Sequence, residues 1–328
     1  MSSQADSGRR VPIEPQSVDA PLTASATFLV VTVANAPDAV KTVRSAIAGI
    51  GDLTKSVGFR DLGANFTCTV GIGSAVWDSL TGGLRRPAEL HPFQAIHGPK
   101  HTAVATPGDV LFHIRAERRD LCFEFEKQLL DRLGDAVSVV DETVGFRYFD
   151  NRDLLGFIDG TANPTGPAVR DSVVVATEDD NAPFVGGSYV VVQKYLHDMT
   201  AWRGLATEAQ EAIIGRTKLD NMELPDATGA ATQRSHKTLN TVDDSVGGGE
   251  LAILRDNMPF GAPGSGEFGT YFIGYTRRLW VIEKMLQNMF LGDPPGLHDR
   301  LLDYSRAVTG SVFFVPSASL LASLAGDD

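Results

Sequence analysis

The sequence Asp-Val-Leu-Phe-His-Ile-Arg-Ala at residues 109–116 is followed by a helical pattern over residues 119–133. The first run is mostly apolar and predicts a buried strand, while the second has apolar residues at helical spacing and predicts an amphipathic helix. The same order returns in Phe-Gly-Thr-Tyr-Phe-Ile-Gly-Tyr at residues 268–275, which precedes residues 277–291. The apolar stripe of this later helix consists of Leu279, Ile282, Met285, Leu286 and Met289. The chain therefore predicts the same strand and helix pair in each half.

Each half also begins with a strand and a helix, and a second strand lies between the two pairs. These elements are the strand 26–33, helix 38–48 and strand 65–72 of the first half, and the strand 187–195, helix 199–205 and strand 250–255 of the second. Strand, helix and strand, repeated twice, is the ferredoxin-like plan. We therefore predict an α+β fold of two tandem ferredoxin-like halves, each an antiparallel sheet with helices on one face.

The repeat divides the chain into four parts. We predict a flexible or surface-wrapping arm over residues 1–22, a first half over 23–150, a second half over 151–316 and a C-terminal tail over 317–328. Two long stretches, 135–185 and 220–249, are rich in loop residues. Because long loops inside compact domains are often functional, we expect the site in the second half, to which both loops belong.

Composition excludes several classes of protein. The 328 residues include 29 Lys and Arg against 41 Asp and Glu, a net charge of −12. This acidity opposes general affinity for nucleic acid, which requires a basic surface. No apolar run approaches the roughly 18 residues of a membrane span. Arg9-Arg10 lacks the apolar core that an export signal needs, so we expect a cytoplasmic protein.

Cysteine spacing excludes a further group of sites. Cys68 and Cys122 are far apart, and the chain has no Cys-x-x-Cys pair. Zinc-ribbon, thioredoxin-like and covalently attached haem sites all need such a pair, so they are ruled out. We expect both thiols to serve as small apolar core residues.

The loop Gly156-Phe-Ile-Asp159-Gly160-Thr161-Ala-Asn163-Pro164 carries one carboxylate between turn residues. Gly160 accepts a positive φ without steric cost, and Asn-Pro favours a turn. Asp159 is therefore predicted on irregular backbone, where reactive groups tend to lie. The alternative is that Asp159 only bonds its own turn.

Two other segments carry side chains suited to chemistry. His236 lies in Gln-Arg-Ser-His-Lys-Thr at residues 233–238, within the second long loop, and Arg255-Asp256-Asn257 follows a predicted strand. A histidine is a common axial ligand of haem iron, and a guanidinium keeps its charge and offers five donors. The alternatives are a solvated loop histidine and an Arg255 that pairs with Asp256 or another acid. The other histidines form no HExxH pattern.

In this order, the three segments resemble the GxxDGT, Ser-His and RDN motifs of the dye-decolourising peroxidases, which are haem enzymes. The resemblance extends from about residue 22 to 316 and includes residues 145–150, 267–275 and 307–316. The compact length is most like the bacterial B-type subgroup.

The resemblance implies a haem b peroxidase. Hydrogen peroxide would convert the haem to a ferryl porphyrin-radical state that oxidises dyes, phenolics or other bulky reductants, whether organic molecules or metal ions. His236 would be the axial ligand of the haem iron. Apart from the resemblance, a proximal histidine usually donates its second ring N–H to an acceptor, for which Asp303 is a candidate; the alternative is that Asp303 is an ordinary acid on a helix surface. The residues implied for catalysis are Asp159, Arg255 and Asn257, and those implied for cofactor contact are Gly160, Thr161, Arg234 and Phe260. Whether Asp159 or Arg255 dominates peroxide activation stays open.

Family resemblance also suggests a homo-oligomer and a protein shell, or nanocompartment, as a partner. The apolar and then acidic ending of residues 318–328 does not clearly match the usual docking tail. The alternatives are a haem-binding or iron-releasing protein without peroxidase activity, a cargo or scaffold protein, and a haemless binding module.

Overall fold

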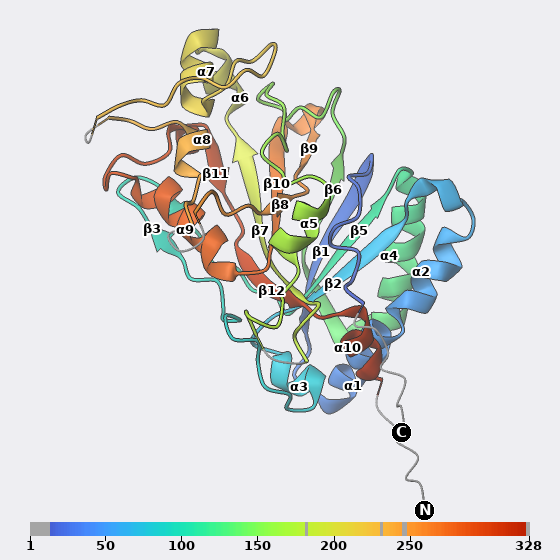
Figure 1. Cartoon of the computed structure of the whole chain (residues 1–328). Helices are drawn as coiled ribbons and strands as arrows, with labels where there is room; N and C mark the ends of the chain where they lie inside the picture. Colours follow the sequence, from blue (N-terminus) through green and yellow to red (C-terminus); the bar gives the residue numbers. More distant parts are fainter. Residues whose placement is uncertain (1–13, 181–182, 230–231, 245–247, 326–328) are drawn as a thin grey trace, which may run out of the picture.

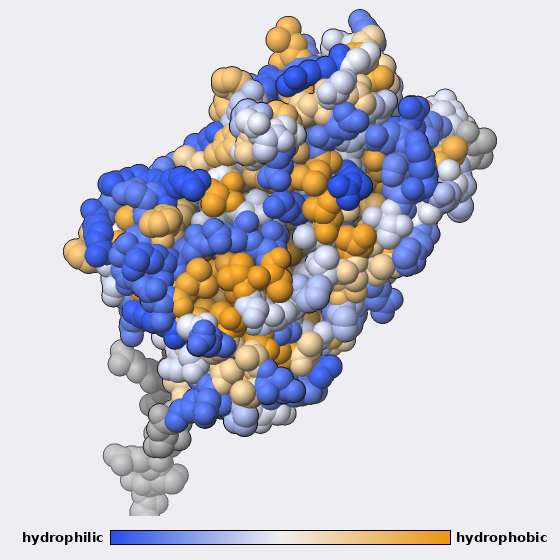
Figure 2. All heavy atoms as spheres, turned by 180° about the vertical axis from the view of Figure 1, so that it is seen from behind, coloured by the Kyte–Doolittle hydropathy of each residue, from blue (hydrophilic) through white to orange (hydrophobic). Residues whose placement is uncertain are grey.

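The computed structural model describes residues 14–180, 183–229, 232–244 and 248–325. A central layer of strands is flanked by helices on both sides (Figure 1). Within the described ranges, no helix is long and apolar enough to cross a membrane. The face seen in Figure 2 mixes hydrophilic side chains with separate apolar groups.

The first half is a four-stranded antiparallel sheet in the order β6-β1-β5-β2. Its strands are β1 (Ser25–Val33), β2 (Thr67–Ile72), β5 (Val110–Ala116) and β6 (Val137–Phe146). Helices pack on its outer face, and they are α1 (Pro37–Ala48), α2 (Ile50–Gly58) and α4 (Arg119–Leu133). Alternate residues of β5, such as Phe112 and Ile114, face these helices because side chains of a strand point to opposite sides.

The second half repeats this topology in the order β12-β7-β10-β8. Its strands are β7 (Ser188–His197), β8 (Leu254–Arg255), β10 (Glu267–Thr276) and β12 (Ser311–Val315), and α9 (Leu279–Leu291) packs on the outer face. In both halves the fourth strand lies beside the first, and the third separates the first from the second. The prediction of two tandem ferredoxin-like halves is therefore confirmed.

Shorter elements connect these strands. They are η1 (Leu62–Ala64), α3 (Trp77–Thr81), β3 (Ile96–His97), β4 (Thr102–Ala103), η2 (Gly134–Ala136), α5 (Pro167–Val173), α6 (Met199–Arg203), α7 (Thr207–Ile214), α8 (His236–Leu239), β9 (Met258–Ala262), η3 (Pro263–Ser265), η4 (Arg300–Asp303), β11 (Ser305–Ala307) and α10 (Ala318–Ser323).

The two halves share one sheet that folds back on itself. They join edge to edge where Phe314 of β12 pairs with Ile72 of β2. Away from this join the inner faces meet, because Phe28 of β1 stacks on Tyr271 of β10 with ring centroids 4.1 Å apart. The inner layer is thus a core between the halves, and the helices cover the outer faces. Each half would expose its inner face without the other.

Two sequence expectations need correction. The stretch 135–185 was expected to be rich in loops, with no strand predicted in it, yet Val137–Phe146 is the ten-residue strand β6. This strand lies at the edge of the sheet and most of its side chains are at least partly exposed, so it lacks the apolar run of a buried strand. The predicted strand at residues 250–255 is reduced to Leu254–Arg255.

Both described ends of the chain are packed. The side chain of Gln16 exchanges hydrogen bonds with the backbone of Val70 and also donates to the carbonyl of Pro316. Leu321 and Leu324 are buried near the end of the chain. The surface-wrapping interpretation therefore fits residues 14–22, and residues 318–324 belong to the fold rather than to a loose tail. The rest of the predicted arm, residues 1–13, and residues 326–328 lie outside the described residues.

Candidate functional site

A deep cavity lies between the outer face of the second sheet and the helices that cover it. Alternate residues of β7 and β10 form its floor, including Tyr195, Thr270 and Phe272. Most of its walls are apolar, and these residues are Leu155, Phe157, Ile214, Leu251, Ile253, Ile282, Met285, Leu286, Met289, Leu301 and Leu302. The cavity therefore suits a largely apolar ligand with a few polar groups.

Asp159 reaches the cavity from the loop that precedes α5. Its Oδ1 accepts a hydrogen bond from the backbone of Gly160 at 2.6 Å, and its Oδ2 accepts one from Asn257 Nδ2 at 2.9 Å. Gly160 has a φ of 78°, and an added Cβ would lie 3.3 Å from Asn163 Nδ2. Glycine is needed at this position for both reasons, and the turn fixes the carboxylate.

Arg255 is tied to the same loop through its backbone. Asn163 Nδ2 donates to the carbonyl of Arg255 at 2.7 Å, and Asn163 Oδ1 accepts from its N–H at 3.0 Å. Its Nε is buried and has no partner among the described residues. Asp256 does not pair with Arg255, since its carboxylate binds Arg115 instead. Arg255 therefore brings a guanidinium with unused donor capacity to the cavity.

Asn257 completes this group. While its Nδ2 donates to Asp159, its Oδ1 accepts from the backbone of Ile273 at 3.1 Å. The amide is therefore held from both ends. The three catalytic residues predicted from separate motifs, Asp159, Arg255 and Asn257, line one cavity together with His236.

His236 is the first residue of the short helix α8, which Ser235 caps. Its Nδ1 lies 2.6 Å from Oδ2 of Asp299, a fully buried acid. Because a carboxylate only accepts, Nδ1 carries the proton and Nε2 is left as the ring nitrogen available to a metal. Such a carboxylate orients a ligating histidine and raises its basicity.

The expected acceptor Asp303 was wrong. Asp303 binds His101 and His298 instead, and the acceptor is Asp299, which is 63 residues from His236 in the chain. The two acids lie at opposite ends of the short 3-10 helix η4: Asp299 is its N-cap and Asp303 is its last residue. No local pattern distinguishes these two acids in the sequence.

A second histidine, His197, also lines the cavity. Its Nδ1 lies 2.8 Å from Ser305 Oγ and its Nε2 lies 2.9 Å from Thr270 Oγ1. Burial lowers the pKa of His197 to about 4, so the ring is neutral. With both nitrogens engaged, His197 is a structural residue and His236 is the ligand candidate.

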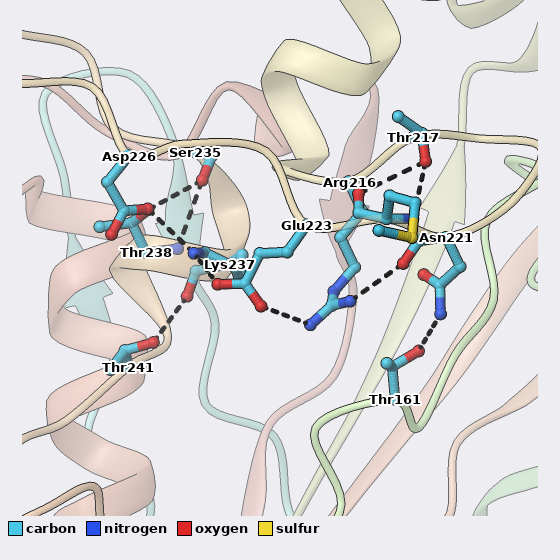
Figure 3. Close-up of polar contacts among 11 residues, drawn as sticks. Thr161, Arg216, Thr217, Asn221, Glu223, Asp226, Ser235, Lys237, Thr238 and Thr241 are labelled. Atoms are coloured by element: carbon cyan, nitrogen blue, oxygen red, sulfur yellow. Dashed lines mark hydrogen bonds and ion pairs between the residues drawn. The ribbon is translucent and has the colours of Figure 1, made fainter.

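Charged side chains gather at the mouth of the cavity, where the Glu223 side chain is 56% exposed to solvent. Figure 3 shows the polar contacts of this group. Arg216 and Lys237 both line the cavity, and both bind the carboxylate of Glu223, at 3.1 Å and 2.6 Å. Asn221 joins this group to the Asp159 loop by donating to Thr161 Oγ1 at 2.9 Å. Two cations are thus placed where a ligand could present carboxylates.

Four residues besides His236 were predicted to contact a cofactor, and two of them line the cavity in the structure. Gly160 and Thr161 line the cavity. Arg234 does not, and it binds Asp293 instead. Phe260 does not line it either, because it is buried in the inner layer beneath Lys194, whose Nζ is 4.6 Å from the ring centroid. Arg216, which the sequence did not single out, lines the cavity.

A cluster outside the cavity also has the residue types of a metal site. The ligand atoms of His101, His298 and Asp303 lie within 4.8 Å of one another. Lys100 and Arg300 also bind the carboxylate of Asp303, however, so its single negative charge already has two cationic partners. We therefore interpret this cluster as a link between the β3–β4 loop and η4.

Asp153 is a cavity acid that the sequence did not indicate. Burial, with a contribution from Asp159, raises its pKa to about 7, and its Oδ1 accepts from the backbone of Phe157 at 2.9 Å. An unfolded aspartate has a pKa of about 3.9. The folded state therefore holds this proton more tightly, and the free energy of unfolding falls as pH rises between about 4 and 7.

We expect Asp153→Asn to remove this penalty while keeping the acceptor for Phe157. The variant should gain stability relative to the parent protein as pH rises, by at least about 1 kcal/mol between pH 4.5 and 8. Urea unfolding of both proteins at the two pH values measures the difference. If the free energies of unfolding of the two proteins differ by the same amount at both pH values, the raised pKa of Asp153 is contradicted.

Known proteins are similar to this chain over most of its length. The family model described as Dyp-type peroxidase, N-terminal, matches residues 15–147, and the C-terminal model matches residues 150–320. The dye-decolorizing peroxidase of Mycobacterium tuberculosis is 53% identical over 309 residues, which cover 94% of this chain and 90% of that protein.

Solved structures are equally similar. A variant of DypB from Rhodococcus jostii RHA1, in complex with heme, is 52% identical with a TM-score of 0.89 and covers 95% of this chain and 99% of its own. The encapsulated DyP-type peroxidase from Mycobacterium smegmatis is 51% identical with a TM-score of 0.89, and covers 95% of this chain and 98% of its own.

The fold and the cavity define a haem-dependent oxidoreductase. The chain belongs to the Dyp-type peroxidase family and is most like the B-type subgroup. It is therefore a haem b peroxidase, which uses hydrogen peroxide to oxidise a reductant.

Proposed function

We propose that His236 Nε2 binds the haem iron from one side of the cavity, and that Asp159, Arg255 and Asn257 act on peroxide at the other. The hydrogen bond from His236 Nδ1 to Asp299 is the observation that carries the proposal, because it selects Nε2 as the metal ligand. The apolar walls suit the macrocycle, and Arg255 Nε, which has no partner among the residues that the structure describes, suits an anionic ligand in the same cavity.

The mouth of the cavity supplies the remaining contacts. Arg216 and Lys237 would bind the two haem carboxylates, exchanging part of their present contact with Glu223 for them. Arginine matches carboxylate geometry with paired donors, and lysine acts as a point charge. Arg216 and Lys237 are preferred to Arg234 for this role because they line the cavity and Arg234 does not.

When bound, haem supplies iron that takes two oxidising equivalents from peroxide and passes them to a reductant. The protein residues prepare that reaction. Arg255 donates to the peroxide anion and stabilises the charge that develops as the O–O bond breaks. Asn257 stays neutral and orients the same oxygens, while Asp159 accepts the peroxide proton, directly or through one water, and returns it to the leaving oxygen.

Titration of the apo-protein with haemin, followed by stopped-flow mixing with one equivalent of hydrogen peroxide, tests the proposal. We expect saturation at one haem per chain and a rapid shift of the Soret band. A band that stays ferric, or simply bleaches, would instead support the alternative of haem binding or iron release without peroxidase turnover.

Replacing Asp299 tests the ligand assignment. We expect Asp299→Asn to weaken haem affinity by about tenfold to a hundredfold and to raise the haem reduction potential, because the imidazole becomes less basic. Haemin titration and spectroelectrochemistry measure the two effects. Asp303→Asn is the matched control, since Asp303 is one helical turn away but does not contact His236. Equal effects in both variants would contradict the assignment.

The partners and the cellular location complete the proposal. We propose bulky organic molecules or metal ions as reductants, a homo-oligomer, and a cytoplasmic location, with enclosure in a protein shell supported by the likeness to the encapsulated Mycobacterium smegmatis protein. Since Leu321 and Leu324 are buried, residues 318–324 would not themselves dock to a shell. Co-purification with a shell protein tests the enclosure.

A further inference from the structure

The residue between Arg255 and Asn257 points away from the cavity. Asp256 is 1% exposed and its backbone N–H donates to the carbonyl of Ile273 at 3.1 Å. Asp256 faces the inner layer between the two halves, where it binds Arg115. Its two neighbours, Arg255 and Asn257, line the cavity.

Arg115 of β5 in the first half holds Asp256 in this position. Its Nη1 donates to Asp256 Oδ2 at 2.7 Å, and its Nη2 donates to the carbonyl of Ser17. Arg115 is fully buried, and its strand neighbour His113 brings Nε2 to 3.8 Å from the same carboxylate oxygen. Burial lowers the pKa of His113, so the charge of Asp256 is balanced by Arg115 and not by the histidine.

A buried ion pair of this kind is weak evidence for stability. Removing two charges from water costs several kcal/mol per ion, and well-packed apolar side chains often serve as well. The pair does have a geometric effect that an apolar contact lacks. It fixes the direction of the Asp256 side chain, and with it the backbone that carries Arg255 and Asn257.

We propose that Arg115 is a positioning residue for the peroxide reaction, and that it acts through Asp256 to hold Arg255 and Asn257 toward the cavity. The first half of the chain thereby controls the position of residues 255–257 in the second half, which we call the catalytic turn. The pair also keeps the Asp256 carboxylate from competing for the guanidinium of Arg255. This inference rests on the roles proposed above for Arg255 and Asn257.

The test compares Arg115→Met with a matched loss of charge elsewhere in the inner layer. Lys194 forms a comparable contact, with its Nζ 3.8 Å from Asp141 across the two halves, and it does not line the cavity. Lys194→Met should therefore lower stability without moving the catalytic turn. Thermal unfolding of each apo-protein measures how much stability each substitution removes, independently of the reaction with peroxide.

We expect Arg115→Met to lower the second-order rate constant for peroxide, per bound haem, by about tenfold to a hundredfold, as small misplacements of catalytic groups do. Fluoride affinity of the ferric protein should fall as well, since distal donors stabilise a bound anion. The rate of the later reaction with the reductant should not change. Lys194→Met should leave all three quantities near those of the parent protein.

Arg115→Met that reacts with peroxide and binds fluoride like the parent protein would overturn the inference, as would an equal loss in Lys194→Met. If Arg115→Met does not fold, Asp256→Asn and Asp256→Ala decide the question. Asparagine at position 256 keeps an acceptor for Arg115, so Asp256→Asn should react with peroxide faster than Asp256→Ala. Equal second-order rate constants for peroxide in the two variants would overturn the inference. If Arg255→Ala also reacts normally, the proposed function fails, whereas a slow Arg255→Ala beside a normal Arg115→Met overturns this inference alone.

Discussion

Replacing His236 by alanine is expected to weaken haem binding by about a hundredfold or more and to abolish the spectrum of a histidine-ligated ferric haem. The iron would lose its protein ligand, and the apolar contacts of the cavity would remain as the main source of affinity. Haemin titration and the position of the Soret and charge-transfer bands measure both effects. Peroxidase turnover should fall with them.

His197 provides a matched control in the same cavity. Both of its ring nitrogens are engaged by hydroxyl groups, so His197→Ala should destabilise the protein while keeping the axial ligand. His236→Gly offers a second check, because free imidazole should enter the space and restore the ligated spectrum. An unchanged spectrum in His236→Ala, or its loss only in His197→Ala, would contradict the assignment.

Arg255→Ala is expected to lower the second-order rate constant for peroxide by about a hundredfold to a thousandfold, the range found when one preorganised donor to a developing anion is removed. The structure supports Arg255 as the principal group over Asp159. Both oxygens of Asp159 already accept hydrogen bonds, from Gly160 and Asn257, whereas Arg255 Nε has no partner in the described part of the chain.

Stopped-flow mixing with peroxide at several concentrations measures the rate constant, and Asp159→Ala should lose about tenfold, less than the usual range for a general base. Arg234→Ala is the charge-matched control, since Arg234 binds Asp293 and does not line the cavity. A larger loss in Asp159→Ala than in Arg255→Ala would make the carboxylate the principal catalyst.

A feature could be predicted from the sequence when the residues that determine it lie close together in the chain. The helix at residues 119–133 was predicted to the residue because its apolar spacing lies within the helix itself. Strand β6 was missed, since an exposed edge strand is held by backbone pairing with β1 and needs no apolar run. Asp159, Arg255 and Asn257 could be singled out because each lies in a short motif, and the structure brings them to one cavity.

Residues that act through a distant partner were not predictable. Asp299 and Arg115 are, respectively, 63 and 141 positions from the residues that they bind. Either side chain alone reads as an ordinary surface acid or strand residue. Their roles follow from burial, and burial depends on which segments the fold brings together.

The sequence by itself determined the two ferredoxin-like halves, the loop that holds Asp159 and the order of the three motifs, because these depend on residue spacing and turn chemistry within short segments. Only the tertiary structure decided that the halves close over a shared inner layer, that Asp299 and not Asp303 lies against His236 Nδ1, and that Arg115 binds Asp256. These features depend on contacts between distant segments, whose energies come from burying apolar faces and pairing charges that water would otherwise separate.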